Sequence, residues 1–257
     1  MPAVPPSTLD DLGVPGCLAL AALLMAQEHR TAIAPTRRMA LAQLLQLREL
    51  GIIDTPWPEL RWAMEPAADE TPLEQIQWRY AWPDYLRGGL LETLQEFLDG
   101  VPRDDYGLAL RLRLWTELAA AEAESFLLAQ LKKSRFDPEW AQDMAFVIRD
   151  AKVVLPIAQW RYCAWAAVRQ GASFAHQKAI TDPPVIREAV FRELQRRAAW
   201  VARSDVKQFS FAPFQARPDN AMSRLFVESL APMDMGFWVL PPSLEALLVL
   251  RSYATTP

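Results

Sequence analysis

Few residues in this chain are of the types that carry out catalysis or bind metals. Its 257 residues include two cysteines, Cys17 and Cys163, and two histidines, His29 and His176. These four residues are scattered and form no CxxC or HExxH spacing, which are the patterns that zinc sites use. Nine glycines form neither a GxGxxG nor a GxxxxGK phosphate-binding loop. We therefore expect no metal and no cofactor, and we predict that the protein is not an enzyme.

Two glutamates are candidate buried acids. Glu117 and Glu124 lie two helical turns apart in the stretch 107–133, near the edge of an apolar face. A carboxylate at that edge needs an arginine or a hydrogen-bond partner, or it takes up a proton. We interpret both as structural acids that pair with arginines, such as Arg113 at i,i+4. The alternative is a pair of functional acids in a helical pocket, as a hydrolase would use.

A row of basic residues is the candidate nucleic-acid site. Spaced by four, seven and four residues, its members share one face if the helix persists that far: Arg192, Arg196, Arg203 and Lys207. Such a row can follow a phosphate backbone. The alternative is a solvated face on which Glu188 pairs with Arg192 at i,i+4. Nucleic-acid binding through this face is therefore the alternative function.

Aromatic residues alternate with smaller or polar ones in two stretches of the first hundred residues. The stretches are residues 60–64, which contain Trp62, and residues 76–82, which contain Trp78 and Trp82. This period predicts two half-buried strands. We interpret the three tryptophans mainly as the inner face of a small sheet, and secondarily as a hydrophobic partner-binding patch. Base stacking is a third option.

Two predicted helices precede these strands, and the second helix with the two strands follows the order of elements found in a known domain type. A helix is predicted from Pro15 to His29, and Thr36 can cap a second helix that ends at Gly51. Helix, strand, loop and strand over residues 37–83 resemble the second half of a winged-helix domain. The resemblance implies a small β-hairpin and DNA binding.

The charges of this region favour a different partner. The segment that would form the wing holds Glu65, Asp69, Glu70 and Glu74 and no basic residue. Acids beside phosphates cost energy, so a winged helix of this composition suits a protein partner better than DNA. A competing interpretation of Thr71 to Glu74 is a capping box with proline at the first helical position, which predicts a helix there.

The rest of the chain is predicted to be helical. The stretch 107–133 has no proline or internal glycine and is the longest expected helix. Other predicted helices span 90–98, 139–154, 157–170 with an end at Gly171, 183–203, 221–230 and 243–253, with an extended piece at 237–240.

Charge divides the chain into two regions. Residues 1–106 hold 8 Lys/Arg against 16 Asp/Glu, and residues 107–257 hold 19 against 15. This asymmetry predicts a tail at 1–12, an acidic N-terminal domain at 13–104 and a helical C-terminal domain at 105–257. The fold class is therefore mainly α, with a bundle-like C-terminal region and a winged-helix-like N-terminal region.

The N-terminus carries no basic segment of the kind that starts a secretion signal. The apolar run 17–26 is about half the length of a membrane span, so we expect a cytoplasmic protein without membrane contact. The first hypothesis is a non-catalytic protein-interaction or regulatory component of a bacterial intracellular assembly. Protein partners are expected, and the sequence does not predict the oligomeric state.

Overall fold

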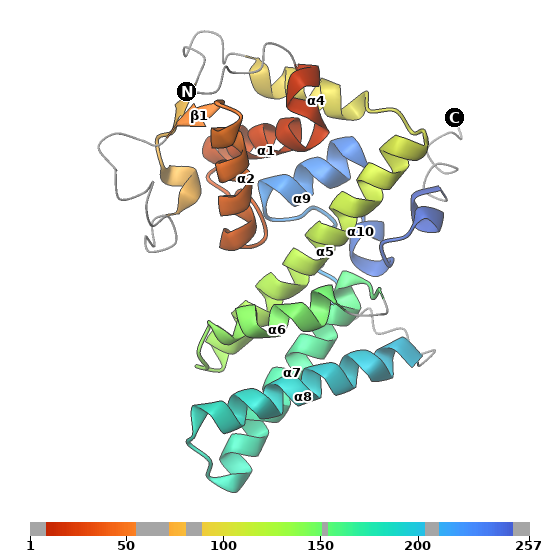
Figure 1. Cartoon of the computed structure of the whole chain (residues 1–257). Helices are drawn as coiled ribbons and strands as arrows, with labels where there is room; N and C mark the ends of the chain where they lie inside the picture. Colours follow the sequence, from red (N-terminus) through yellow and green to blue (C-terminus); the bar gives the residue numbers. More distant parts are fainter. Residues whose placement is uncertain (1–8, 55–71, 81–88, 151–153, 204–210, 249–257) are drawn as a thin grey trace. The chain divides into compact units, whose positions relative to one another are not determined.

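A computed structural model describes residues 9–54, 72–80, 89–150, 154–203 and 211–248 (Figure 1). The described chain is mainly α-helical, as predicted, with one two-stranded sheet. It divides into a first unit, residues 1–111 with 217–232, and a second unit, residues 112–216 with 233–257. The division falls inside the long helix α5 (Asp105–Lys133) and not at residue 104.

The first unit is built on helix α1 (Leu9–His29). Most of its residues from Gly16 onward are buried, because leucine and alanine surround the helix on all sides, the pattern of a core helix. The helix begins at Leu9, inside the segment expected to be a tail. Gly13 bends it with a φ of 65°, a conformation that glycine adopts readily, and Pro15 follows the bend.

Helix α1 is also the one helix of the described chain with the length and apolar composition to cross a membrane. Its mean hydropathy is 1.6, and 61% of the apolar window is buried within the protein. Buried helices in the cores of globular proteins share both properties. Packing within the first unit therefore accounts for its apolar character.

The other elements of the first unit come from both of its chain segments. Backbone N–H groups of Ala221 and Met222 donate to the carbonyls of Ala32 and Ile33, each at 2.9 Å, which ties the second segment to the loop after α1. The elements that pack on α1 are α2 (Arg37–Glu49), α4 (Leu90–Asp99) and α9 (Ala221–Leu225), and α9 continues as the π-helical turn η3 (Phe226–Leu230).

The predicted ends of α2 are confirmed. Thr36 Oγ1 accepts a hydrogen bond from the Met39 N–H at 3.2 Å, which satisfies a backbone donor at the helix start. The helix ends at Glu49, and Gly51 follows with a φ of 70°.

The small sheet pairs β1 (Ile53–Asp54) with β2 (Arg79–Tyr80) in antiparallel register. The predicted strand at 76–82 is confirmed only at Arg79–Tyr80. Residues Leu73–Gln75 form the short 3-10 helix η1, where the capping-box alternative placed a helix start. The predicted partner strand, 60–64, lies outside the described residues, and the winged-helix arrangement is not confirmed.

A buried arginine locks the start of α5 to the first unit. Arg111 is 3% exposed, and its guanidinium donates three hydrogen bonds of 2.7 Å, to the carbonyls of Leu230, Pro102 and Val101. Burial lowers the pKa of Arg111, and the neighbouring Arg103 lowers it further. Gly107 allows this approach, because a Cβ at that position would lie 1.9 Å from the Pro102 carbonyl oxygen.

The second unit contains the remainder of α5 and several further helices. Its centre is an antiparallel hairpin of α7 and α8, which lie side by side (Figure 1). The further helices include α6 (Trp140–Arg149), α7 (Ile157–Lys178), α8 (Pro183–Arg203) and α10 (Gly236–Val239), and residues 244–248 are also helical.

Three predictions for this unit are wrong. Helix α6, expected over residues 139–154, ends at Arg149. Helix α7 passes through Gly171, where an end was predicted, and ends at Lys178, so His176 lies in its last turn. A Cβ on Gly171 would lie 2.3 Å from Val190 Cγ2, so this glycine serves close helix packing instead of a helix end. Residues Gly236–Val239 form a helical turn and not the extended piece expected there.

Candidate functional site

The predicted acids on α5 do not form a common site. Glu117 is exposed, whereas Glu124 is 5% exposed and forms an ion pair with Arg149 of α6. Glu124 is therefore an acid bound by an arginine of a neighbouring helix, which is the structural interpretation of the sequence. Neither glutamate lines the groove described below.

The cysteines and histidines are also kept apart. Burial raises the pKa of both thiols, Cys17 and Cys163, to about 12, so both stay protonated at neutral pH. His29 and His176 are exposed near the C-terminal ends of α1 and α7. Among the described residues, no group of three or more His, Cys, Asp or Glu is placed to hold a metal ion.

Of the three candidate partner-binding tryptophans, the structure describes one. Trp78 is 7% exposed, and its indole N–H donates to the Leu73 carbonyl at 3.3 Å. Its ring thus belongs to the core of the first unit, as aromatic residues at strand spacing usually do. Trp62 and Trp82 lie outside the described residues.

An open groove of about 360 Å³ lies between α6 and α8 of the second unit. Three apolar side chains line it: Met144 and Phe146 from α6, and Phe191 from α8. The two phenylalanine rings are tilted against each other with centroids 5.5 Å apart. Phe146 is 48% exposed, which is unusual for so large an apolar side chain.

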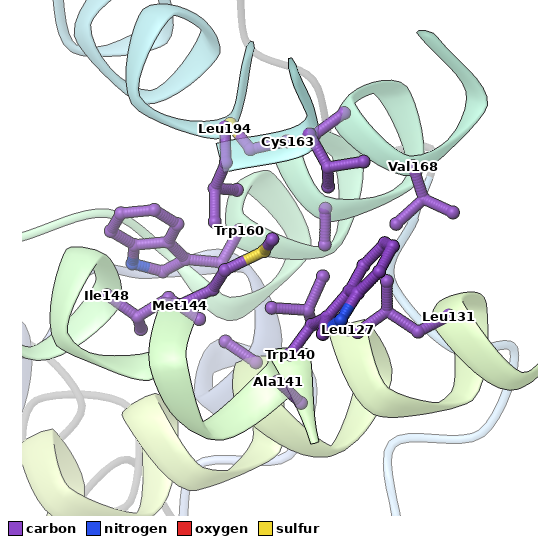
Figure 2. Packing of buried hydrophobic residues seen from close by; sticks show 14 of the residues in the cluster. Leu127, Leu131, Trp140, Ala141, Met144, Ile148, Trp160, Cys163, Val168 and Leu194 are labelled. Atoms are coloured by element: carbon purple, nitrogen blue, oxygen red, sulfur yellow. The ribbon is translucent and has the colours of Figure 1, made fainter. Parts of the chain in front are cut away.

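The core below the groove fixes these positions (Figure 2). Helices α6 and α8 each turn one face toward the core, and on α8 the buried residues Ile186, Val190 and Leu194 are spaced by four. The buried residues of the two helices are Trp140, Ala141, Met144, Ala145 and Ile148 on α6, and Ile186, Val190, Glu193, Leu194 and Val201 on α8. Phe146 and Phe191 lie beside these stripes, so both helices can be anchored while Phe146 stays exposed and Phe191 stays half-buried.

Ion pairs form the rim of the groove. Arg187 of α8 donates to Asp143 of α6 at 3.0 Å across the groove, and Arg192 pairs with Glu188 along α8. All four side chains are at least half exposed, so each pair contributes only about 0–1 kcal/mol to stability. The charged residues that line the groove are Asp143, Glu188 and Arg187, and Arg192 lies next to the groove and pairs with Glu188, so the charges around the groove are balanced.

Comparison of the chain with protein families, with curated proteins and with solved structures finds no significant match. Sequence reasoning missed the groove because Phe146 and Phe191 lie on separate helices. One signal was available, since Phe146 falls outside the apolar stripe of its own helix.

The predicted arginine row is present on α8 as far as Arg203, the last residue of this helix that the structure describes. Arg192 pairs with Glu188 at i,i+4, as the alternative interpretation predicted. The Arg203 Nε donates to the carbonyl of Ala199 at 3.0 Å. Lys207 lies outside the described residues.

Glu193 is the buried acid that organises the middle of this row. It accepts two hydrogen bonds from Arg196, at 2.6 and 2.7 Å, and one from Arg197 at 2.7 Å. The two hydrogen bonds from Arg196, and then the one from Arg197, hold the pKa of Glu193 below its ordinary value, although burial acts to raise it. Arg197 also donates to the Tyr162 hydroxyl at 3.0 Å, which joins α8 to α7.

Proposed function

We propose that this protein is a non-catalytic interaction component of a bacterial intracellular assembly, and that a partner docks in the groove between α6 and α8. The observation that carries the proposal is the exposed ring of Phe146, packed against the half-buried ring of Phe191 in a groove with a balanced rim. Large aromatic side chains at the centre of a patch, surrounded by polar groups, are typical of the residues that dominate protein–protein binding.

The groove favours an amphipathic helix as its occupant. Two helices, α6 and α8, form its sides, and a third helix laid along them would bury the phenylalanines with its own apolar side chains. The groove is open, whereas sites for small molecules usually enclose most of the ligand surface. A helix of a partner protein therefore fits this surface better than a small ligand.

The rim supports the same choice. Its arginines already pair with Asp143 and Glu188, so neither sign of charge dominates around the apolar floor. A polyanion gains little from such a rim, whereas a helix with acidic and basic residues on its flanks can exchange partners with both pairs. We infer that the partner helix carries charges of both signs beside its apolar stripe.

A winged-helix-like arrangement of residues 37–83 is the second part of the proposal. Helix α2, followed by the antiparallel pair of β1 and β2, supports it. The acids of the intervening segment favour a protein partner over DNA for this region as well.

Site-specific photocross-linking in the native host tests the groove. We place the photoreactive residue benzoylphenylalanine at Phe146 and, as the control, at Tyr106, which is 79% exposed on the first unit. We expect position 146 to form a cross-link to one partner, and the cross-linked peptide to come from an amphipathic helix. Cross-links to the same proteins from both positions would contradict the proposal.

Binding of the purified partner then tests the energetics. The Phe146→Glu substitution places a charge in the apolar floor and should weaken binding by at least about 10-fold, as loss of a dominant interface residue does. The control Val185→Glu adds the same charge at another exposed apolar position, in the first turn of α8. Equal affinities of the two variants, or cross-linking only to a second copy of the chain, would overturn the proposal.

A further inference from the structure

A second surface of this unit has a different character from the groove. The outward face of α8 beyond the groove is a stripe of six exposed residues that contains three arginines, one tryptophan and no acid. These residues, which we call the α8 stripe, are Arg192, Gln195, Arg196, Ala199, Trp200 and Arg203. We propose that the α8 stripe binds single-stranded nucleic acid, with Trp200 stacking on a base and the arginines contacting phosphates.

Two acids, Glu188 and Glu193, lie near the α8 stripe, and both leave its arginines available to bind a phosphate. The pair of Arg192 with Glu188 is exposed on both sides, so its net contribution is small and a phosphate can replace the carboxylate. Arg196 shares Glu193 with Arg197. When Arg196 turns to a phosphate, Glu193 keeps Arg197 and does not become an unpaired buried charge.

Trp200 is the exposed edge of a larger aromatic cluster. It is 41% exposed, and its ring centroid lies 6.5 Å from that of Tyr162 on α7. Tyr162 in turn lies 6.4 Å from Trp165 and 5.8 Å from Phe211. The hydrogen bond from Arg197 to the Tyr162 hydroxyl fixes this neighbour of Trp200. A base that stacks on Trp200 therefore meets a supported ring.

The spacing of the stripe suits a strand that runs along the helix. With a rise of about 1.5 Å per residue, Arg196 is about 6 Å from Arg192 and about 10 Å from Arg203 along the axis. Trp200 lies between Arg196 and Arg203, so one base can stack on its ring while the phosphates on either side of that base each reach a guanidinium. A duplex keeps its bases stacked on each other, which makes the single strand the better ligand.

The positive charge of the hairpin of α7 and α8 favours a nucleic-acid ligand at this part of the surface. The hairpin of α7 and α8, residues 157–203, holds eight Lys/Arg and three Asp/Glu, and α7 contains no acid. The whole chain carries a net charge of −4, so long-range attraction does not assist binding. We therefore expect modest affinity, on the order of micromolar at about 50 mM salt, that rests on the stripe itself.

Fluorescence anisotropy with the full chain tests the proposal. The probes are labelled oligothymidylate and oligouridylate of about 20 nucleotides, which present the same chemistry from DNA and RNA. Three phosphate contacts predict a plot of log affinity against log salt with a slope of about −2. Trp200→Ala should weaken binding by about 5-fold to 150-fold, because it removes one stacked base.

Matched arginine variants separate the stripe from general charge. The double variant Arg192→Gln with Arg203→Gln should reduce the salt slope to about −0.7, since one phosphate contact remains. Arg187→Gln is the control, because Arg187 lies on the same helix at the groove rim and not in the stripe. It should leave the affinity within about 2-fold.

Several outcomes would overturn the inference. They are the absence of binding at low salt, equal losses in Arg187→Gln and in the double variant Arg192→Gln with Arg203→Gln, and an unchanged affinity for Trp200→Ala. Binding to vesicles of phosphatidylcholine and phosphatidylserine but not to either oligonucleotide would assign the stripe to an anionic membrane surface instead. Phe146 and Phe191, which carry the proposed function, are unchanged in every variant of this test, so its failure leaves the proposed function standing.

Discussion

Burial determines the chemistry of the two thiols of this protein. Cys163 lies in the core of the second unit among residues such as Trp160 and Leu194 (Figure 2). Cys17 lies in the buried part of α1. A thiolate in such surroundings loses its hydration, so the protonated form is favoured and the pKa rises to about 12. The thiolate, and not the thiol, is the nucleophile. The two cysteines therefore act as small apolar side chains.

We predict that neither cysteine reacts with iodoacetamide in the folded protein at pH 8, and that both react in urea. Mass spectrometry of the labelled peptides measures each site. The raised pKa also makes the stability of the protein depend on pH. The contribution of the buried, protonated thiol to the free energy of unfolding is fully present below the ordinary thiol pKa of 9.0, and it is lost as the pH rises toward about 12. Rapid labelling of either site in the folded state would contradict this account.

At the scale of elements, the hairpin of α7 and α8 depends on one glycine. Val190 is fully buried, and its Cγ2 occupies the place that a side chain at position 171 would need. Glycine inside a helix normally costs about 1 kcal/mol relative to alanine. Here the close contact between the helices compensates for that cost, so alanine is the worse residue despite its higher helix propensity.

We predict that Gly171→Ala destabilises the protein by about 1–3 kcal/mol, because the added methyl group overpacks the contact. Val190→Ala also destabilises the protein, since it leaves a cavity. The double variant should be more stable than the sum of the two single changes implies, because the new methyl fills part of that cavity. Urea denaturation of all four proteins measures this coupling, and additive effects would rule out the contact as the cause.

For the molecule as a whole, each unit is made of two separate stretches of chain. In the first unit, α9 and η3 belong to the second stretch, residues 217–232, and pack on α1 and α4. The carbonyl of Leu230, at the end of that stretch, also receives a hydrogen bond from Arg111. The first 111 residues alone therefore lack part of their own core.

We predict that a fragment of residues 1–111 does not unfold cooperatively, and that an added peptide of residues 217–232 restores a cooperative transition. Circular dichroism during urea titration measures both states. The control is the same peptide with Leu225→Asp, which places a charge at a fully buried position and should not restore folding. A fragment that unfolds cooperatively without the peptide would show that the second stretch is dispensable.

Much of the local structure was predictable because its causes are local. The long α5 helix follows from a run of strong helix formers, and Thr36 and Gly51 mark the ends of α2. The i,i+4 pair of Glu188 and Arg192 follows from helical spacing. The scarcity of cysteine and histidine, and the basic row on α8, are likewise properties of the sequence alone.

Other features depended on contacts between residues far apart in the chain. Gly171 signals a helix end by its residue type, but packing against Val190 keeps it inside α7. Glu117 and Glu124 have similar positions in the helical pattern, yet Glu117 is exposed whereas Glu124 is buried and pairs with Arg149. The groove and the support of Trp200 by Tyr162 likewise require separate helices to come together. Sequence periodicity describes one element at a time, so only the tertiary structure decides which side chains are neighbours.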